Sequence, residues 1–542
     1  MSTPLARRAT ATALAAAMLA AGPLALAAPA SAAAPAAAAS ATAPVLRFVD
    51  IPGSGGVVLK GNVYAPADGA AHHPLVVMPA SWSLNDLEYL AQAQQLAAAG
   101  YVVVSYTPRG FWGSGGQIEV AGPPDVADIS KVIDWSLANT AADPGRIGMA
   151  GISYGAGLSL LGAAFDPRVR TVAALSGWAD LVASLYSDET QHLQSAGLLT
   201  LAGYLTGRPS DELQQMLISF FGSDQPNEDT VKAWAKVRSP ATYLDRINAG
   251  GASVMLANAW GDSIFPPNQL TDFFERLTGP KRLELRPGDH ATAEATGLLG
   301  LPNDVWTDTR RWLDHYLMGA DNGIDREQPV HIEPQLQDSY EDYPSWQAVS
   351  SSSVRLGLGA RDWLGTGSLG AGAGTGWRTP VTTGADSGAD GGVIFLSNLA
   401  EQFLKIPPLV SVPLLPRAVS AVWQSAFYGS AQRIRGSVRA HLGVVPGSGQ
   451  GSLIAYLYDV DALGIGRLVS QAPYTFLGRT PGARFEADIA LQSTAYDIPA
   501  GHRLALVVDT VDPLYITHNT AGSTLTFDSP AADPSWISVP LK

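Results

Sequence analysis

The sequence predicts an α/β domain built on a mostly parallel sheet, followed by an all-β sandwich domain. Up to about residue 328, apolar strand-like runs alternate with helical patterns, which indicates a parallel sheet with helices on both faces. Beyond that point, short alternating runs are separated by turn residues, as is typical of a β-sandwich. A chain of 542 residues is also too long for one compact core, so two or three domains are expected.

The first domain is predicted to span residues 44–328. Its strands are short apolar runs of the kind that parallel sheets bury on both faces. The expected strands are 57–64, 75–78, 101–106, a run ending at 152, 169–176, 253–258 and 282–285, and the expected helices are 86–99, 125–139, 158–165 and 306–318. A helical stretch over about 178–247 contains no clear strand, and we interpret it as a cap over the strand ends.

The second domain is predicted to span residues 329–542 and to contain a linker and an irregular insert besides its strands. Residues 365–392 are rich in Gly, Ala, Thr and Ser and are expected to form a loop. The expected strands are 393–396, 434–442, 452–459, 485–491, 503–508 and 524–527. Residues 407–423 are apolar and interrupted by proline, so they form either a loop packed on the sandwich or part of the mouth of the substrate site.

The N-terminus has the features of an export signal. Arg7 and Arg8 precede an alanine-rich apolar run, and Ala30-Ser31-Ala32 supplies small residues for cleavage. We therefore expect residues 1–32 to be a signal peptide and residues 33–43 to be a flexible lead-in. The apolar run is short for a membrane anchor, so a secreted, extracellular protein is expected. The choice between the general and the twin-arginine export route stays open.

The composition excludes several classes of function. A formal net charge of −14 and a pI near 5.0 argue against a nucleic-acid partner, which requires a basic surface. The chain has no cysteine, which excludes disulfides, a thiol nucleophile and cysteine-type metal sites. No motif indicates a metal, a nucleotide or a flavin, so no cofactor is expected. The sequence does not indicate the oligomeric state.

The clearest chemical motif is Gly151-Ile152-Ser153-Tyr154-Gly155, which follows an apolar run and precedes a helix of small residues. This is the layout of a nucleophile elbow, which holds a serine on a strained turn between a strand and a helix. Gly at both flanking positions leaves room for that turn. Ser153 is therefore the candidate nucleophile.

A serine nucleophile needs a base, and the base needs a carboxylate that orients it. In hydrolases with such an elbow the acid and then the histidine follow in loops after later strands. Asp262 comes just after the predicted strand 253–258, and His290 follows the predicted strand 282–285. These two residues are the candidate acid and base. Asp289 is a rival carboxylate, but neighbouring residues on a turn usually point apart.

The oxyanion hole needs two hydrogen-bond donors. The backbone N–H of Tyr154, directly after the nucleophile, is the first candidate. The second is expected in the loop after strand 75–78, where Ser81 or Trp82 could offer a backbone N–H. The Trp82 indole is a further possible donor, although a role in lining the pocket is as reasonable.

The elbow belongs to an ordered series of motifs. The others are 109–115 (RGFWGSG), 133–135 (IDW), 312–319 (WLDHYLMG) with 321–324 (DNGI), 455–461 (AYLYDVD), 499–504 (PAGHRL) and 534–540 (PSWISVP). This series resembles the X-Pro dipeptidyl-peptidase and cocaine-esterase-like (acyl esterase) family of serine hydrolases over nearly the whole mature chain. The resemblance implies an α/β-hydrolase domain with a helical cap, a C-terminal jelly-roll-like sandwich, and a triad that matches Ser153, Asp262 and His290.

Two positions depart from the family pattern. Family members place a tyrosine in the first oxyanion loop, where this chain has Ala80-Ser81-Trp82-Ser83. The aspartate before the Arg-Gly pair is replaced by Thr107. Both departures indicate a divergent branch, so the substrate of a named member is not carried over.

The sequence therefore predicts a secreted serine hydrolase that cleaves either an acyl ester or an amino-terminal, X-Pro-type dipeptidyl bond. A dipeptidase would need a carboxylate for the substrate amine, and the cap offers Asp188, Glu189, Asp211 and Glu212. An esterase needs only an apolar pocket. The alternative from another class is a non-catalytic secreted protein that binds carbohydrate or polymer on a hydrolase scaffold.

Overall fold

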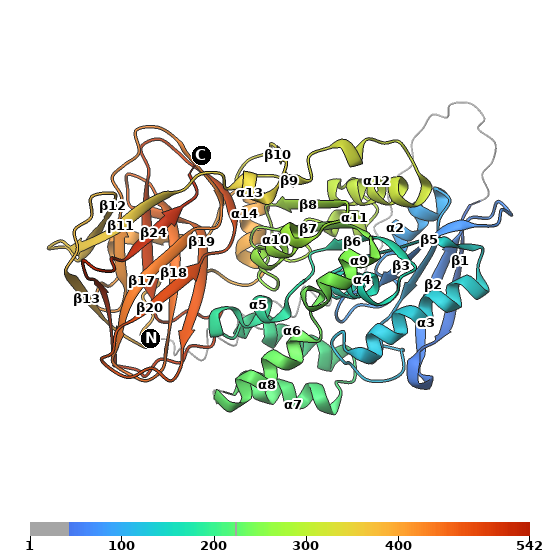
Figure 1. The fold of residues 1–542 in the computed structure, drawn as a ribbon, viewed down its shortest axis with the longest axis horizontal. Helices are drawn as coiled ribbons and strands as arrows, with labels where there is room; N and C mark the ends of the chain where they lie inside the picture. The colour runs from blue at the N-terminus through green and yellow to red at the C-terminus, as the bar shows by residue number, and fades with distance from the viewer. Residues whose placement is uncertain (1–42, 223–224, 542) are drawn as a thin grey trace.

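The computed structural model describes residues 43–222 and 225–541, so the predicted signal peptide and nearly all of the lead-in lie outside the described residues. Figure 1 shows an α/β body and an all-β body side by side, with a group of helices below their junction. Both bodies were predicted. None of the described helices is long and apolar enough to cross a membrane.

The α/β body is organised around a ten-stranded sheet with the strand order β1-β2-β4-β3-β5-β6-β7-β8-β9-β10. Neighbouring strands are parallel from β4 to β9, and the pairs at the two edges are antiparallel. The strands are β1 (Val45–Pro52), β2 (Val58–Ala65), β3 (His73–Pro79), β4 (Val102–Tyr106), β5 (Ala142–Ile152), β6 (Val169–Leu175), β7 (Ser253–Ala259), β8 (Lys281–Arg286), β9 (Val330–Ile332) and β10 (Glu341–Tyr343).

Helices cover both faces of this sheet, which explains why its central strands are continuously apolar. Leu75 and Val77 of β3 pack in one buried cluster, whereas Val76 and Met78 pack in another on the opposite face. The first face is covered by α3 (Pro123–Asn139), α4 (Tyr154–Phe165) and α10 (Pro267–Arg276), and the second by α2 (Leu90–Ala98) and α12 (Asp304–Met318). A short α11 (Ala295–Leu298) precedes α12.

The predicted cap is an all-helical insertion between β6 and β7. Its helices are α5 (Leu181–Leu185), α6 (Leu193–Thr206), α7 (Asp211–Phe221) and α8 (Gln225–Lys236), and they form the group below the junction in Figure 1. A fifth helix, α9 (Leu244–Gly250), returns to the main body and packs on α4.

The all-β body is a twelve-stranded, mostly antiparallel sheet that folds over on itself, with a separate two-stranded ribbon of β16 and β21. Its two layers enclose one apolar core, to which non-adjacent strands such as β17 and β18 both contribute. The strands are β11 (Val354–Arg361), β12 (Thr366–Gly370), β13 (Trp377–Thr382), β14 (Leu409–Ser411), β15 (Ala421–Gln424), β16 (Gln432–Gly436), β17 (Arg439–Pro446), β18 (Gly451–Val460), β19 (Ile465–Phe476), β20 (Phe485–Ala490), β21 (Thr494–Ile498), β22 (Arg503–Asp509), β23 (Thr524–Ser529) and β24 (Trp536–Val539).

Four segments differ from their predictions. The expected strand 434–442 consists of parts of two strands, β16 and β17, which belong to different sheets. Residues 365–392 contain the strands β12 and β13, and Gly is used there because a Cβ at Gly367 would lie 2.2 Å from the Trp423 ring. The expected strand 393–396 is instead the approach to a helix, α14 (Leu396–Leu404). Residues 407–423 belong to the sandwich, because β14 pairs with β19 and β15 lies between β12 and β22.

The sheet of the α/β body also continues past the predicted boundary at residue 328. β9 pairs in parallel with β8, and β10 pairs with β9, so the first body ends after Tyr343. A short helix, α13 (Trp346–Val349), then leads to the sandwich. Chain length alone could not show that two short edge strands follow α12.

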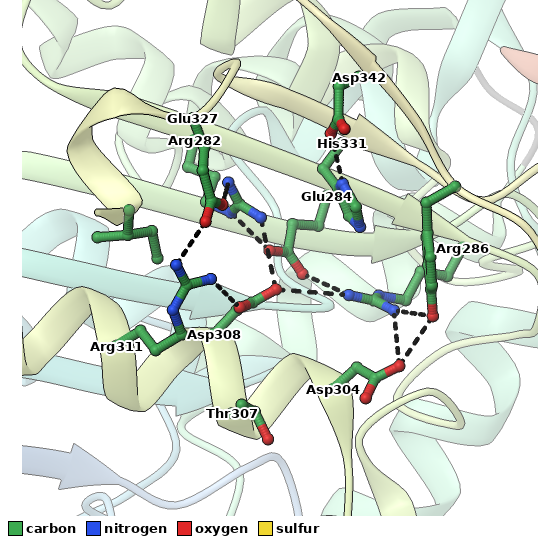
Figure 2. Close-up of polar contacts among 12 residues, drawn as sticks. Arg282, Glu284, Arg286, Asp304, Thr307, Asp308, Arg311, Glu327, His331 and Asp342 are labelled. Atoms are coloured by element: carbon green, nitrogen blue, oxygen red, sulfur yellow. Dashed lines mark hydrogen bonds and ion pairs between the residues drawn. The ribbon is translucent and has the colours of Figure 1, made fainter. Parts of the chain in front are cut away.

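A network of buried charges fixes the edge of the sheet near β8 (Figure 2). Arg282 and Arg286 project from β8 on either side of Glu284, and each donates to one of its carboxylate oxygens at 2.7 and 2.9 Å. Asp308 of α12 and Glu327 also accept from Arg282. Because Glu284 is fully buried, its charge depends on both arginines. The network ties α12 to the strand that leads to His290.

Candidate active site

Ser153 lies on a sharp turn between β5 and α4. Its φ of 55° and ψ of −115° are strained for a residue with a side chain. The two flanking glycines allow this turn, since a Cβ at Gly151 would lie 2.7 Å from the backbone of Gly155. A Cβ at Gly155 would lie 2.1 Å from the carbonyl oxygen of Pro79. The elbow therefore packs directly against the end of β3.

The structure brings the three predicted residues into one chain of hydrogen bonds. The Ser153 hydroxyl lies 2.8 Å from Nε2 of His290, and Nδ1 of the same ring lies 3.0 Å from Oδ2 of Asp262. All three side chains are buried. Nδ1–H donates to the carboxylate in the tautomer that leaves Nε2 free to accept the serine proton.

Asp262 is held by the turn that follows β7. Its Oδ1 accepts the backbone N–H groups of Ile264 at 2.9 Å and Phe265 at 2.7 Å. Oδ2, at 3.0 Å, is the nearer of the two oxygens to Nδ1 of His290, and Oδ1 lies 3.2 Å from the same nitrogen. The turn therefore fixes both the position and the rotation of the carboxylate.

The electrostatic environment of His290 suits a general base. Burial disfavours the charged ring, but the charge and the hydrogen bond of Asp262 outweigh burial and raise the pKa of His290 above its ordinary value. The ring packs edge-on against Phe265, with centroids 5.2 Å apart. At pH values below this raised pKa, the His290 ring is protonated and cannot accept the serine proton.

The two candidate oxyanion residues of the first loop have different positions. Ser81 is directed away from Ser153, because its N–H and hydroxyl donate to Glu88 at 2.7 and 2.6 Å. The Trp82 indole donates to the Leu199 carbonyl of the cap at 2.8 Å and is not free either. Within the described part of the chain, the backbone N–H groups of Trp82 and Tyr154 have no protein acceptor.

Asp289, the rival candidate for the acid, accepts no hydrogen bond from the His290 ring and instead connects three segments of the chain. Its Oδ1 accepts the N–H and hydroxyl of Ser263 and the N–H of His290. Its Oδ2 accepts the N–H of Phe395 and the amide of Asn398, both at 2.9 Å. Asp289 thus joins the acid loop, the histidine loop and α14 of the following domain. No local sequence signal could have revealed these distant partners.

A second buried carboxylate near the histidine was also missed by sequence reasoning. Glu294 accepts the hydroxyl of Ser176 at 2.9 Å, and the same hydroxyl accepts the N–H of Ala291, next to His290. Burial raises the pKa of Glu294 to about 7. Its position four residues after the histidine was the only signal available.

An apolar pocket adjoins Ser153, with about 880 Å³ of space not filled by protein atoms, part of it open to solvent. Its walls come mainly from the cap, and they carry no Asp, Glu, Lys, Arg or His among the described residues. The lining side chains include Trp82, Trp178, Leu199, Leu213, Phe220 and Phe265. The four cap carboxylates considered for a substrate amine are absent from this lining. Two of them are paired elsewhere, Glu189 with Lys232 and Glu212 with Arg238.

Over residues 43–222 and 225–541, no group of three or more His, Asp or Glu residues is arranged to hold a metal ion.

Comparisons with known proteins agree with this fold. The X-Pro dipeptidyl-peptidase (S15 family) model matches residues 55–292, and the X-Pro dipeptidyl-peptidase C-terminal non-catalytic domain model matches residues 322–535. A Streptomyces avermitilis protein provisionally named a Xaa-Pro dipeptidyl-peptidase is 22% identical over 501 residues, which cover 79% of this chain and 70% of that protein.

A Mycobacterium bovis protein provisionally named a serine esterase is 23% identical over 318 residues, or 51% of this chain. The alignment spans 47% of that relative, about half of its length.

Solved structures share the fold over nearly the whole chain. An alpha-amino acid ester hydrolase superposes with a TM-score of 0.68 at 17% identity, covering 94% of this chain and 98% of that one. A CocE/NonD family hydrolase from Staphylococcus aureus gives a TM-score of 0.68 at 13% identity, covering 92% and 93%. The two family models follow one another along most of the sequence, so the chain belongs to the X-Pro dipeptidyl-peptidase (S15) family of serine hydrolases.

Proposed function

We propose that the protein is a serine esterase that transfers an apolar acyl group to Ser153 and then to water. The observation that carries this proposal is the chain of hydrogen bonds from Asp262 through His290 to Ser153, placed beside an apolar pocket. An ester whose acyl part is an alkyl chain or a ring would leave water and enter that pocket.

In the proposed reaction, the Ser153 oxygen attacks the ester carbonyl while its proton passes to Nε2 of His290. Asp262 stabilises the imidazolium through Nδ1–H. The N–H groups of Tyr154 and Trp82 would donate to the oxyanion. The alcohol leaves with the proton from Nε2, and a water molecule, activated by the same nitrogen, hydrolyses the acyl-enzyme.

The pocket favours an ester over an amino-terminal dipeptide. A free ammonium group buried in that pocket would have no carboxylate to pair with, because no lining side chain in the described chain carries a charge. An unpaired buried charge is strongly disfavoured. An acyl chain meets no such penalty.

The test compares a p-nitrophenyl acyl ester with Ala-Pro-p-nitroanilide and follows labelling by a fluorophosphonate probe. We expect hydrolysis of the ester, little hydrolysis of the anilide, and labelling at Ser153. The Ser153→Ala variant should lose labelling and turnover, and Ser351→Ala, at an exposed serine, should keep both. Absence of labelling in the folded parent protein would favour the binding-protein alternative, and a preference for the anilide would favour the dipeptidase.

Export of the mature protein is also part of the proposal, on the pattern of residues 1–32. Cell fractionation of the full chain and of a chain lacking residues 1–32 tests it. The full chain should reach the medium and the shortened chain should stay inside the cells.

A further inference from the structure

A second cavity lies where the sandwich, the cap and the hydrolase domain meet. It has about 720 Å³ of space not filled by protein atoms, part of it open to solvent. Its walls come from the turn after β7, the N-terminal end of α6, α14, β19 and the segment around Tyr515. Ser153 is not among its lining residues, so this cavity is distinct from the apolar pocket.

Glu401 of α14 is the one acidic or basic side chain, histidine apart, among the described residues that line this cavity. It is 5% exposed, and its carboxylate has no hydrogen bond or ion pair to any described residue. Burial raises the pKa of Glu401 to about 7, against the opposing charge of Lys405. The carboxylate oxygens of Glu401 therefore face the space of this cavity, where a molecule that enters can pair with them.

The charged groups nearest to Glu401 are already paired elsewhere. Lys405 forms an ion pair with Asp338 at 3.0 Å and donates to the carbonyl of Gln337 at 3.1 Å. The Asp289 carboxylate is occupied by its five donors and raises the pKa of Glu401 further. No neighbouring cation therefore neutralises Glu401 directly.

The remaining walls suit a small polar molecule with one positive charge. Oε1 of Gln471 is buried and has no hydrogen-bond partner. His192 is neutral at pH 7, because burial lowers its pKa to about 4, so it does not repel a cation. Trp260 and Tyr515 add aromatic rings, which attract cations through their faces.

We propose that this cavity binds a small organic cation whose ammonium group pairs with the carboxylate of Glu401. A bound ammonium would supply the missing donors to Glu401, and the amide of Gln471 would accept or donate a further hydrogen bond. An anion would face an uncompensated like charge. A divalent metal would find one carboxylate where it requires several oxygen ligands. The proposal is independent of the proposed esterase activity.

The test measures binding of benzylamine and of benzyl alcohol by calorimetry at pH 8 to the full-length Ser153→Ala protein. The two probes have the same ring and differ in the charge of the head group. We expect benzylamine to bind at least about tenfold more tightly, as for a charge-assisted hydrogen bond. In the Glu401→Gln background this preference should disappear, and in the Glu486→Gln background, at a sandwich surface glutamate, it should persist.

A second measurement needs no change at Glu401. Lowering the pH from 8 to 6 protonates Glu401, so benzylamine should bind more weakly to the unsubstituted cavity while benzyl alcohol binding stays constant. Equal affinity for the two probes, no binding of benzylamine, a pH-independent affinity, or a preference that survives Glu401→Gln would each overturn the proposal.

Discussion

Replacing Asp262 by asparagine tests the reasoning about the active site most directly. The two backbone donors, Ile264 and Phe265, require an acceptor at the position of Oδ1. An asparagine must therefore place its carbonyl oxygen there and its NH₂ at the position of Oδ2, facing Nδ1 of His290. The nearer contact of Nδ1 then becomes a donor, at 3.0 Å against 3.2 Å for Oδ1, which favours the ring that accepts at Nδ1 and carries its proton on Nε2. In that tautomer it cannot take the proton of Ser153.

The magnitude follows from two losses. Returning the ring to the active tautomer places two buried donors opposite each other, which costs about 1–3 kcal/mol. The imidazolium of the transition state also loses a charge-assisted hydrogen bond, which contributes about 1.5–3 kcal/mol. The total corresponds to a fall in kcat/KM of roughly 10²–10⁴-fold.

The assay is ester hydrolysis by Asp262→Asn over a range of pH, with circular dichroism to show that the fold is retained. The substitution also removes the main group that raises the pKa of His290, so the midpoint of the residual activity should move to lower pH. A loss of less than about tenfold with an unchanged midpoint would refute the reasoning.

Four further predictions concern the site and the scaffold. Activity of the parent enzyme should fall as His290 becomes protonated, with a midpoint above the ordinary value of 6.5, and a kcat/KM profile with its midpoint below that value would contradict this. Gly155→Ala should destabilise the fold by about 1–3 kcal/mol, because its methyl would overlap Pro79, and denaturant unfolding with activity measurements checks this. Ala196→Phe should fill part of the apolar pocket and lower kcat/KM for an octanoyl ester about tenfold relative to an acetyl ester. The reason is that the octanoyl chain would lose the burial of two methylenes, which contributes about 1.6 kcal/mol. Equal losses of kcat/KM for both esters would contradict the role of the pocket. Glu284→Gln removes the charge between Arg282 and Arg286, which keep Asp308, Glu327 and Asp304 as partners, and should destabilise the α/β body by about 1.5–3 kcal/mol, visible as a lower thermal midpoint.

The parts of the fold that the sequence predicted are those in which local pattern and burial agree. The run 75–78 is apolar at every position because helices cover both faces of β3. Ser153 could be found because an elbow imposes glycine on both sides of the nucleophile. Asp262 and His290 could be found because parallel strands bring their following loops to one edge of the sheet.

The parts that sequence reasoning missed depend on contacts between distant residues. Glycine in residues 365–392 resembled a loop, yet Gly367 makes room for a tryptophan from another strand. The apolar run at 393–396 resembled a strand, but the N–H of Phe395 is required by Asp289. The Trp82 indole was predicted as a possible oxyanion donor, and only the structure shows that it donates to the Leu199 carbonyl of the cap. Such pairings have no local pattern.

The double attachment of Asp289 has a consequence for how this enzyme can be divided. Its Oδ2 donors are Asn398 of α14 and Phe395, the residue directly before α14, and both follow the α/β sheet in the chain. An α/β domain produced alone, ending after Tyr343, would keep Ser153, Asp262 and His290 but would carry a buried Asp289 without two of its donors beside His290. The proposed site therefore depends on both domains, and an exchange of the sandwich by recombination should keep residues 395–404 with the original α/β domain.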